Sequence, residues 1–102
     1  MNYVIKYSSE AIFELEKLKE YISNKFDAPK AAQKQVSRII KAVNTLAVFP
    51  KLHRERRKTN KGNGMRIYPI DSYVILYSVD EENSTVNISH IIYSKRDIDT
   101  LI

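Results

Sequence analysis

The sequence has 102 residues, of which 43% are apolar, so the chain is long enough for one domain and too apolar for a disordered tail. It has no cysteine, which excludes disulfides, thiolate metal sites and a thiol nucleophile. No apolar run approaches the roughly 18 residues that cross a membrane, no signal peptide is recognisable, and the net charge of +5 favours an anionic partner. We therefore expect a soluble, cytoplasmic, single-domain protein (residues 1–102) that needs no cofactor and no metal.

The first two expected elements are a strand and an amphipathic helix. Tyr3–Tyr7 is rich in residues typical of strands and ends at two serines. Ser8-Ser9, followed by Glu10, is typical of a helix N-cap with an acid in the first turn. Phe13 lies opposite the apolar stripe of this helix and is expected at the surface. The stripe recurs at spacings of three and four residues: Ala11, Leu15, Leu18, Ile22 and Phe26.

A second helix is expected directly after the first. Asp27-Ala28-Pro29 ends one helix and begins the next, since proline is tolerated in a first helical turn. The connection is short, which predicts an antiparallel helical hairpin that ends at Phe49-Pro50. The second apolar stripe consists of Ala32, Val36, Ile39, Ile40, Val43 and Ala47.

All of the excess positive charge lies in Lys51–Gly64, which we call the basic segment. It contains six basic residues and one acid, whereas the other 88 residues carry eleven of each sign. Glycines and asparagines near its end predict a loop. A local field of this kind attracts nucleic acid or an acidic protein segment. We therefore expect a nucleic-acid-binding role for its basic side chains: Lys51, Arg54, Arg56, Arg57, Lys58 and Lys61.

Three strand-like runs follow the basic segment: Met65–Ile70, Tyr73–Val79 and Thr85–Tyr93. Pro69 cannot donate a ladder hydrogen bond, which places the first run at an edge or turns its unpaired side outward. The turn at Asp71-Ser72 leaves the register open, because a two-residue turn places Arg66 beside Tyr77 and a three-residue turn places it beside Leu76, on the other face.

The expected fold class is α+β with the order β-α-α-β-β-β. An N-terminal strand, a two-helix antiparallel hairpin and a three-stranded antiparallel meander together form a curled four-stranded sheet. The helices cover one face of this sheet, which leaves the other face for function.

In this order and at this length, the motifs resemble the RelE/ParE toxin superfamily, the toxins of bacterial type II toxin–antitoxin systems. The resemblance extends from Tyr3 to Leu101. It implies a four-stranded antiparallel sheet and a cognate antitoxin that joins the toxin in a hetero-oligomer. The motifs that carry it are Leu46–Pro50, Gly64–Ile70, Tyr73–Asp80 and Ile92–Asp97.

The RelE branch implies a reaction, cleavage of messenger RNA on the ribosome through attack of a ribose 2′-hydroxyl on the adjacent phosphate. That reaction needs a proton acceptor, cations for the phosphate charge and a proton donor for the leaving oxygen. Arg66 and Arg96 stand where the branch carries basic residues, with His90 or Tyr93 as helpers. Lys95, beside Arg96, is a further candidate for binding nucleic acid.

Three positions depart from that branch. Val74 stands where a strand arginine holds the phosphate, Tyr68 stands at the place of a lysine, and Ile102 stands near the place of a C-terminal tyrosine. The loss of one preorganised donor typically costs about 10²–10³ in rate.

Several functions therefore stay open. The chain could be a ribosome-dependent endoribonuclease, a ParE-like non-catalytic inhibitor of DNA gyrase, or a degenerate toxin that keeps only antitoxin binding. A generic nucleic-acid-binding module is a further alternative, although the basic residues do not follow one helix that could enter a groove. His90 has a purely structural interpretation as well, and His53 could simply lie in the loop.

Overall fold

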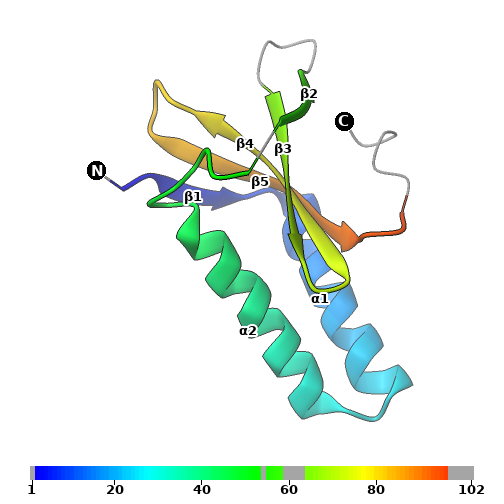
Figure 1. Ribbon diagram of the computed structural model, residues 1–102. Helices are drawn as coiled ribbons and strands as arrows, with labels where there is room; N and C mark the ends of the chain where they lie inside the picture. The colour runs from blue at the N-terminus through cyan, green and yellow to red at the C-terminus, as the bar shows by residue number, and fades with distance from the viewer. Residues whose placement is uncertain (1, 54, 59–63, 97–102) are drawn as a thin grey trace.

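The computed structural model describes residues 2–53, 55–58 and 64–96. Figure 1 shows a helical hairpin that leans against one side of a twisted sheet and extends beyond its edge. The predicted order and fold class are confirmed, with one additional short strand. The elements are β1 (Val4–Tyr7), α1 (Ser9–Lys25), α2 (Pro29–Thr45), β2 (Glu55–Lys58), β3 (Gly64–Ile70), β4 (Tyr73–Asp80) and β5 (Thr85–Tyr93).

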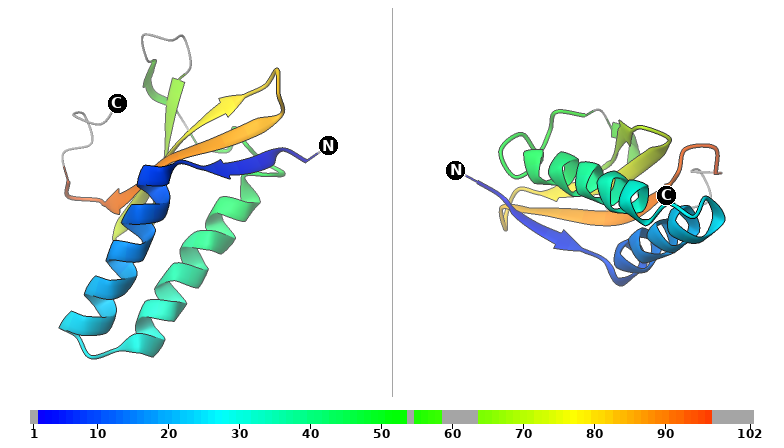
Figure 2. Two further views of the ribbon diagram at one scale, coloured as in Figure 1. Left: turned by 180° about the vertical axis from the view of Figure 1, so that it is seen from behind. Right: turned by 90° about the horizontal axis from the view of Figure 1, so that it is seen from below.

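The helical hairpin begins and turns where the sequence predicts. The Ser8 hydroxyl accepts a hydrogen bond from the backbone N–H of Ala11 at 2.9 Å and so caps α1. Asp27 adopts a left-handed backbone conformation with φ of 46°, which ends the helical path, and Pro29 is the first residue of α2. Figure 2 shows the two helices side by side on the same side of the sheet.

The sheet has five strands in the order β1-β5-β4-β3-β2. Its central strands β3, β4 and β5 form the predicted antiparallel meander. The fully antiparallel sheet that the family resemblance implies is corrected in one respect, because β1 pairs with β5 in parallel and the sheet is mixed. Parallel neighbours need a long crossover, and here the connection contains both helices and the strands β2, β3 and β4.

Strand β2 adds a fifth strand from within the basic segment, where a loop was expected. It pairs with the start of β3, between Gly64 and Arg66. Its sequence, Glu-Arg-Arg-Lys, lacks the β-branched and aromatic residues that predict strands, so local propensity did not reveal it. Pro69 lies in β3 beyond the residues that β2 covers, where the described chain has no further strand, so the edge position predicted for it is confirmed.

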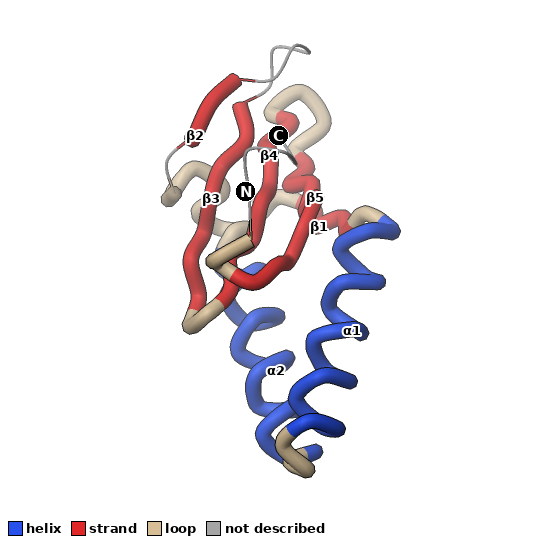
Figure 3. The backbone as a smooth tube through the Cα atoms, turned by 90° about the vertical axis from the view of Figure 1, so that its right-hand side faces the viewer, coloured by secondary structure: helices blue, strands red, loops and turns tan. Residues whose placement is uncertain are grey.

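The main core lies between the helical hairpin and one face of the sheet (Figure 3). The predicted helical stripes contribute to its helical side, but Ile40 is 38% exposed, and Phe26, which follows the last residue of α1, is 62% exposed. Phe13, expected at the surface, is 59% exposed. The buried members of this core include Ala11, Leu18, Ile39, Val43, Leu46, Ile75, Tyr77, Val86, Ile88 and Ile91.

A second, smaller apolar cluster lies on the other face of the sheet. Successive side chains of a strand point to opposite faces, so Val74 and Leu76 of β4 are directed away from the main core. Met65 and Ile92 from the neighbouring strands join them. The face that the sequence analysis reserved for function is therefore apolar at its centre.

The β3–β4 hairpin settles the register that the sequence left open. Its two-residue turn pairs Ile70 with Tyr73, with Asp71 at a φ of 56°, and this register places Arg66 opposite Tyr77. The Asp71 carboxylate accepts hydrogen bonds from Arg38 Nε at 2.8 Å and Nη2 at 2.9 Å. The tip of the hairpin is thereby tied to α2.

Candidate functional site

Side chains of α1 cap the edge of β5 beyond the end of β1. The N–H of Ser8 donates to the carbonyl of Ile88 at 2.9 Å, and this is the last backbone hydrogen bond that continues the pairing of β1 with β5. The Ser8 hydroxyl then donates to the carbonyl of Ser89 at 2.7 Å. Two residues further along β5, the N–H of Ile91 donates to Oε1 of Glu14 at 3.2 Å. Helix α1 therefore satisfies backbone groups that a longer β1 would have paired.

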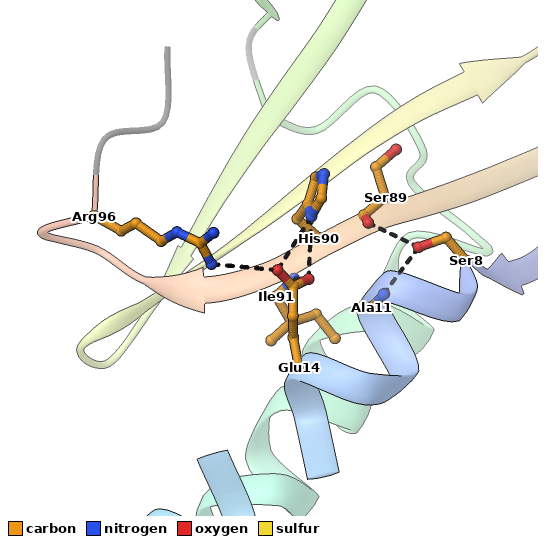
Figure 4. Close-up of polar contacts among 7 residues, drawn as sticks. All are labelled: Ser8, Ala11, Glu14, Ser89, His90, Ile91 and Arg96. Atoms are coloured by element: carbon orange, nitrogen blue, oxygen red, sulfur yellow. Dashed lines mark hydrogen bonds and ion pairs between the residues drawn. The ribbon is translucent and has the colours of Figure 1, made fainter. Parts of the chain in front are cut away.

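Glu14 also brings together two of the predicted site residues, His90 and Arg96. His90 Nδ1 lies 3.1 Å and 3.2 Å from the two carboxylate oxygens, and Arg96 Nη1 lies 3.6 Å from Oε2 (Figure 4). The side chains of Glu14 and His90 are only 15% and 19% exposed, whereas that of Arg96 is 55% exposed. We call these three residues the Glu14 cluster.

The Glu14 cluster fixes the orientation of the His90 ring. An ionised carboxylate can only accept hydrogen bonds, so His90 Nδ1 carries the hydrogen and donates it. Figure 4 shows the rest of the ring directed away from Glu14. A base held by a third group in this way is one signature of acid–base catalysis. The same contacts also serve a purely structural purpose, since they join α1 to the end of β5.

The structure does not bring Arg66 to the Glu14 cluster. Arg66 Nη1 donates to the backbone carbonyl of His53 at 2.8 Å. Arg66 pairs with Tyr77 across β3 and β4, whereas His90 pairs with Leu76 across β4 and β5. Tyr77 and Leu76 are consecutive and belong to the two opposite apolar clusters, so Arg66 and His90 project from opposite faces of the sheet.

One contact of Arg66 is His53, which the sequence analysis had treated as a plain loop residue. The His53 ring stacks on Tyr68 with a centroid distance of 3.6 Å and an interplanar angle of 23°. His53 Nε2 and the Tyr77 hydroxyl are both buried and have no hydrogen-bond partner among the described residues. Burial lowers the pKa of His53 and raises that of Tyr77.

A groove with a volume of about 1300 Å³ lies between α1 and the ends of β4 and β5. Tyr93, another predicted site residue, lines this groove and is 49% exposed. The lining is mostly apolar, with Lys17, Lys25 and Arg96 contributing cationic groups. Its main apolar residues are Phe13, Leu18, Tyr21, Phe26, Tyr73 and Ile92.

The structure describes only some of the predicted nucleic-acid-binding residues. Lys51 is exposed and forms an ion pair with Glu81, and Lys95 is exposed after the end of β5. Arg56, Arg57 and Lys58 belong to β2. The remaining two, Arg54 and Lys61, lie outside the described residues. Their role in binding nucleic acid stays a prediction.

The departures from the RelE branch have clear structural settings where they are described. Val74 is 5% exposed within the second apolar cluster, so no charge is offered at that place. Tyr68 is half-buried beneath His53, and Ile102 lies outside the described residues. Over residues 2–53, 55–58 and 64–96, no group of three or more His, Asp or Glu side chains could hold a metal ion. No described helix is long and apolar enough to cross a bilayer.

Glu14 is the member of the site that sequence reasoning missed. The sequence analysis assigned no role to this charged residue of the first helix. Its position three residues after Ala11 and directly before Leu15 places it at the border of the apolar stripe. This border position is the sequence feature that could have indicated a contact between Glu14 and the sheet. Its partners, His90 and Arg96, come from the far end of the chain, and the sequence does not indicate that they fold close to Glu14.

The fold is that of a small α+β protein with the architecture of toxins from toxin–antitoxin pairs. The chain belongs to the family of ParE toxins of type II toxin–antitoxin systems (parDE), whose family model matches residues 5–98. A comparison with curated proteins finds no match.

Solved structures of toxin–antitoxin complexes contain similar chains. A chain of the RelBE2 complex of Mycobacterium tuberculosis is 19% identical, with a TM-score of 0.65 over 91% of this chain and 99% of that chain. A chain of the chromosomal ParDE system of P. aeruginosa is 16% identical, with a TM-score of 0.70 over 89% of this chain and 95% of that chain. A chain of the archaeal RelE–RelB complex of Pyrococcus horikoshii OT3 is 18% identical, with a TM-score of 0.68 over 95% of this chain and 100% of that chain. At these identities the likeness establishes the shared fold.

Proposed function

We propose that this chain is a growth-inhibiting toxin that acts by binding DNA gyrase without cleaving a nucleic acid. The observation that carries this proposal is the separation of Arg66 from His90 and Arg96. Cleavage of RNA needs cations and a proton acceptor around one phosphate. Arg66 projects from the opposite face to His90, and Arg96 is already paired with the Glu14 carboxylate.

A cognate antitoxin is the second part of the proposal. The similar solved chains come from RelBE2, ParDE and RelE–RelB complexes. The groove beside α1 offers an apolar surface to a partner, because Phe13, Tyr21 and Phe26 are each more than half exposed. A toxin–antitoxin hetero-oligomer in the cytoplasm would keep the toxin inactive.

Ribosome-dependent cleavage of messenger RNA is the second candidate, and one observation favours it. His90 and Arg96 are close together, and Glu14 fixes the tautomer of the His90 ring. A base, its orienting carboxylate and a cation are therefore present in one place. Arg66 and Val74 contribute nothing there, so any such site depends on the Glu14 cluster alone.

The two candidates are separated by assaying the purified chain in two reactions. One measures DNA supercoiling by gyrase, and the other maps cuts in a messenger RNA translated on ribosomes. We expect inhibition of supercoiling and no transcript cuts, with Lys34→Ala, an exposed change on α2, behaving like the wild type. Site-specific cuts that disappear in His90→Ala and Arg96→Ala, with supercoiling unaffected, would overturn the gyrase proposal and favour RNA cleavage.

A further inference from the structure

The loop that follows α2 is tied to the rest of the fold near both of its ends. We call residues 46–53 the anchored loop. Near its start, the carbonyl of Ala47 accepts a hydrogen bond from the N–H of Tyr3 at 2.7 Å. At its end, the carbonyl of His53 accepts one from Arg66 Nη1 of β3 at 2.8 Å. These contacts fix the path of the loop before a partner binds.

The anchored loop nevertheless exposes large apolar side chains. Leu46 at its start is buried in the main core, but Val48, Phe49 and Leu52 are 53%, 61% and 62% exposed. The N–H of Leu52 donates to the carbonyl of Phe49 at 3.2 Å, so these two residues share one tight turn. Single exposed apolar side chains are ordinary, but three within five residues of a fixed loop form an apolar patch that suits a binding partner.

The charge around this patch favours a protein as the partner. Lys51 is the only lysine, arginine, aspartate or glutamate in the anchored loop, and it pairs with Glu81, so the patch is apolar rather than cationic. Nucleic acid is bound mainly through cations on phosphates, whereas an apolar patch is buried by another apolar surface. Directly after the loop, residues 54–61 carry five basic residues and one acid. The complementary surface is therefore an apolar depression on a protein, bordered by carboxylates.

The anchored loop is separate from the groove beside α1. None of the residues that line the groove belongs to the loop. The groove includes Tyr73, the first residue of β4, whereas Lys51 of the loop pairs with Glu81, which directly follows the last residue of β4. At about 3.3 Å per residue, the two ends of this strand lie roughly 23 Å apart. The loop therefore offers a second contact surface, apart from the groove that we assign to an antitoxin.

We propose that the anchored loop is the surface through which this chain contacts gyrase, and that Val48, Phe49 and Leu52 fill an apolar depression on that protein. This inference rests on the proposed function and names the part of the toxin that carries it out. The positive charge that follows the loop in the sequence favours approach to an acidic border of the depression. Because the loop is already fixed, its ordering costs little when the complex forms.

Binding to purified gyrase without DNA, measured by surface plasmon resonance, tests this contact. Leu52→Ser and Phe49→Ser remove apolar area from the patch, and each should weaken both the binding and the inhibition of supercoiling about tenfold or more. The matched control is Ile12→Ser, which changes an isomer of leucine that is about half exposed on α1, outside both the loop and the groove. The control should bind like the wild type. Wild-type affinity in Leu52→Ser, or an equal loss in Ile12→Ser, would overturn the proposal.

A second measurement uses the wild type alone and covers a failure of the variants to fold. The reporters are the amide groups of Phe49 and Leu52, whose hydrogen exchange is followed with and without gyrase. Exchange at these positions should slow about tenfold or more in the complex, because the patch is then closed off from water. Unchanged exchange in the presence of bound gyrase would refute the contact.

The outcomes separate this inference from the proposed function. A wild type that neither binds gyrase nor inhibits supercoiling would refute both. Inhibition by the wild type that persists unchanged in Leu52→Ser and Phe49→Ser would refute the contact alone. If these variants lose binding to bare DNA and keep binding to gyrase, the loop serves nucleic acid. If they abolish a wild-type dimer in sedimentation and keep binding to gyrase, the loop joins two copies of the chain. Either result contradicts the proposal.

Discussion

The Glu14 carboxylate lies 3.1 Å from Nδ1 of His90, although the two residues are 76 positions apart in the sequence. It accepts hydrogen bonds from a side chain and from the N–H of Ile91, and it pairs with Arg96. This one carboxylate therefore joins the first helix to the last strand. Both Glu14 and His90 are largely buried, so the contacts affect stability as well as the orientation of the ring.

Glu14→Ala should destabilise the chain by about 1–3 kcal/mol, since it leaves two partly buried donors without an acceptor. Glu14→Gln should lose less, because the amide oxygen still accepts a hydrogen bond although the attraction to Arg96 is gone. Urea denaturation measures both variants. The control is Glu16→Ala, an exposed acid on the same helix. Equal stabilities for Glu14→Ala and the control would contradict a role for the cluster in stability.

The tie between the β3–β4 hairpin and α2 should make stability depend on pH in acid. The hydrogen bonds from Arg38 and then from Gln35 are the main causes that hold the pKa of Asp71 below its ordinary value of 3.8. The carboxylate therefore stabilises the fold above that value, and the contribution is lost as the pH falls through the lower folded-state pKa.

The difference in unfolding free energy between wild type and Arg38→Ala should therefore be constant from neutral pH down to about 5 and shrink below 3.8. Chemical denaturation at a series of pH values measures it, with Lys34→Ala as a control that removes a neighbouring charge. A difference that persists unchanged at pH 2 would mean that Arg38 acts by packing rather than through Asp71.

Val74→Arg should not rebuild the phosphate site that the RelE branch carries at this position. The side chain is buried in the second apolar cluster, so the substitution places an unpaired charge there and should cost more than about 2 kcal/mol. Val4→Arg, at a position 58% exposed, should change the stability by less than ~0.5 kcal/mol. Thermal unfolding and the transcript-cleavage assay check both statements; a stable, cleaving Val74→Arg chain would refute them.

Ser8→Ala should destabilise the chain by about 0.5–2 kcal/mol, the usual cost of removing an N-cap side chain. The loss should lie toward the upper end because the same hydroxyl also donates to the carbonyl of Ser89. Ser9→Ala, one residue further along and exposed, is the matched control and should have little effect. Equilibrium denaturation followed by circular dichroism distinguishes the two variants.

Sequence reasoning predicted every element except β2, because each of the others carries a local signal. The two helices follow from apolar residues at helical spacing and from capping by Ser8, and the meander follows from β-prone runs and short turns. Phe26 fits the spacing of the first stripe but lies past the last helical residue, where the helical period no longer decides burial. Pairing partners carry no local signal, so the parallel placement of β1 and the addition of β2 were not predictable.

The candidate site was less predictable because it depends on register and on contacts between distant residues. One residue more in the turn at Asp71 would have placed Arg66 on the face of Leu76 and His90. His90 and Arg96 were named from the sequence, but the carboxylate that unites them was not. Whether these residues act on a phosphate stays a prediction that the two assays decide.

Pro69 gives the outer side of β3 a property that matters in a crowded cell. The described chain leaves this strand open beyond Arg66, and an open strand is a template on which other molecules can polymerise. Proline offers no N–H to an incoming strand, and its ring takes up the space that such a strand would need. Fibril-like growth is therefore hindered at this border even when the toxin accumulates without its partner.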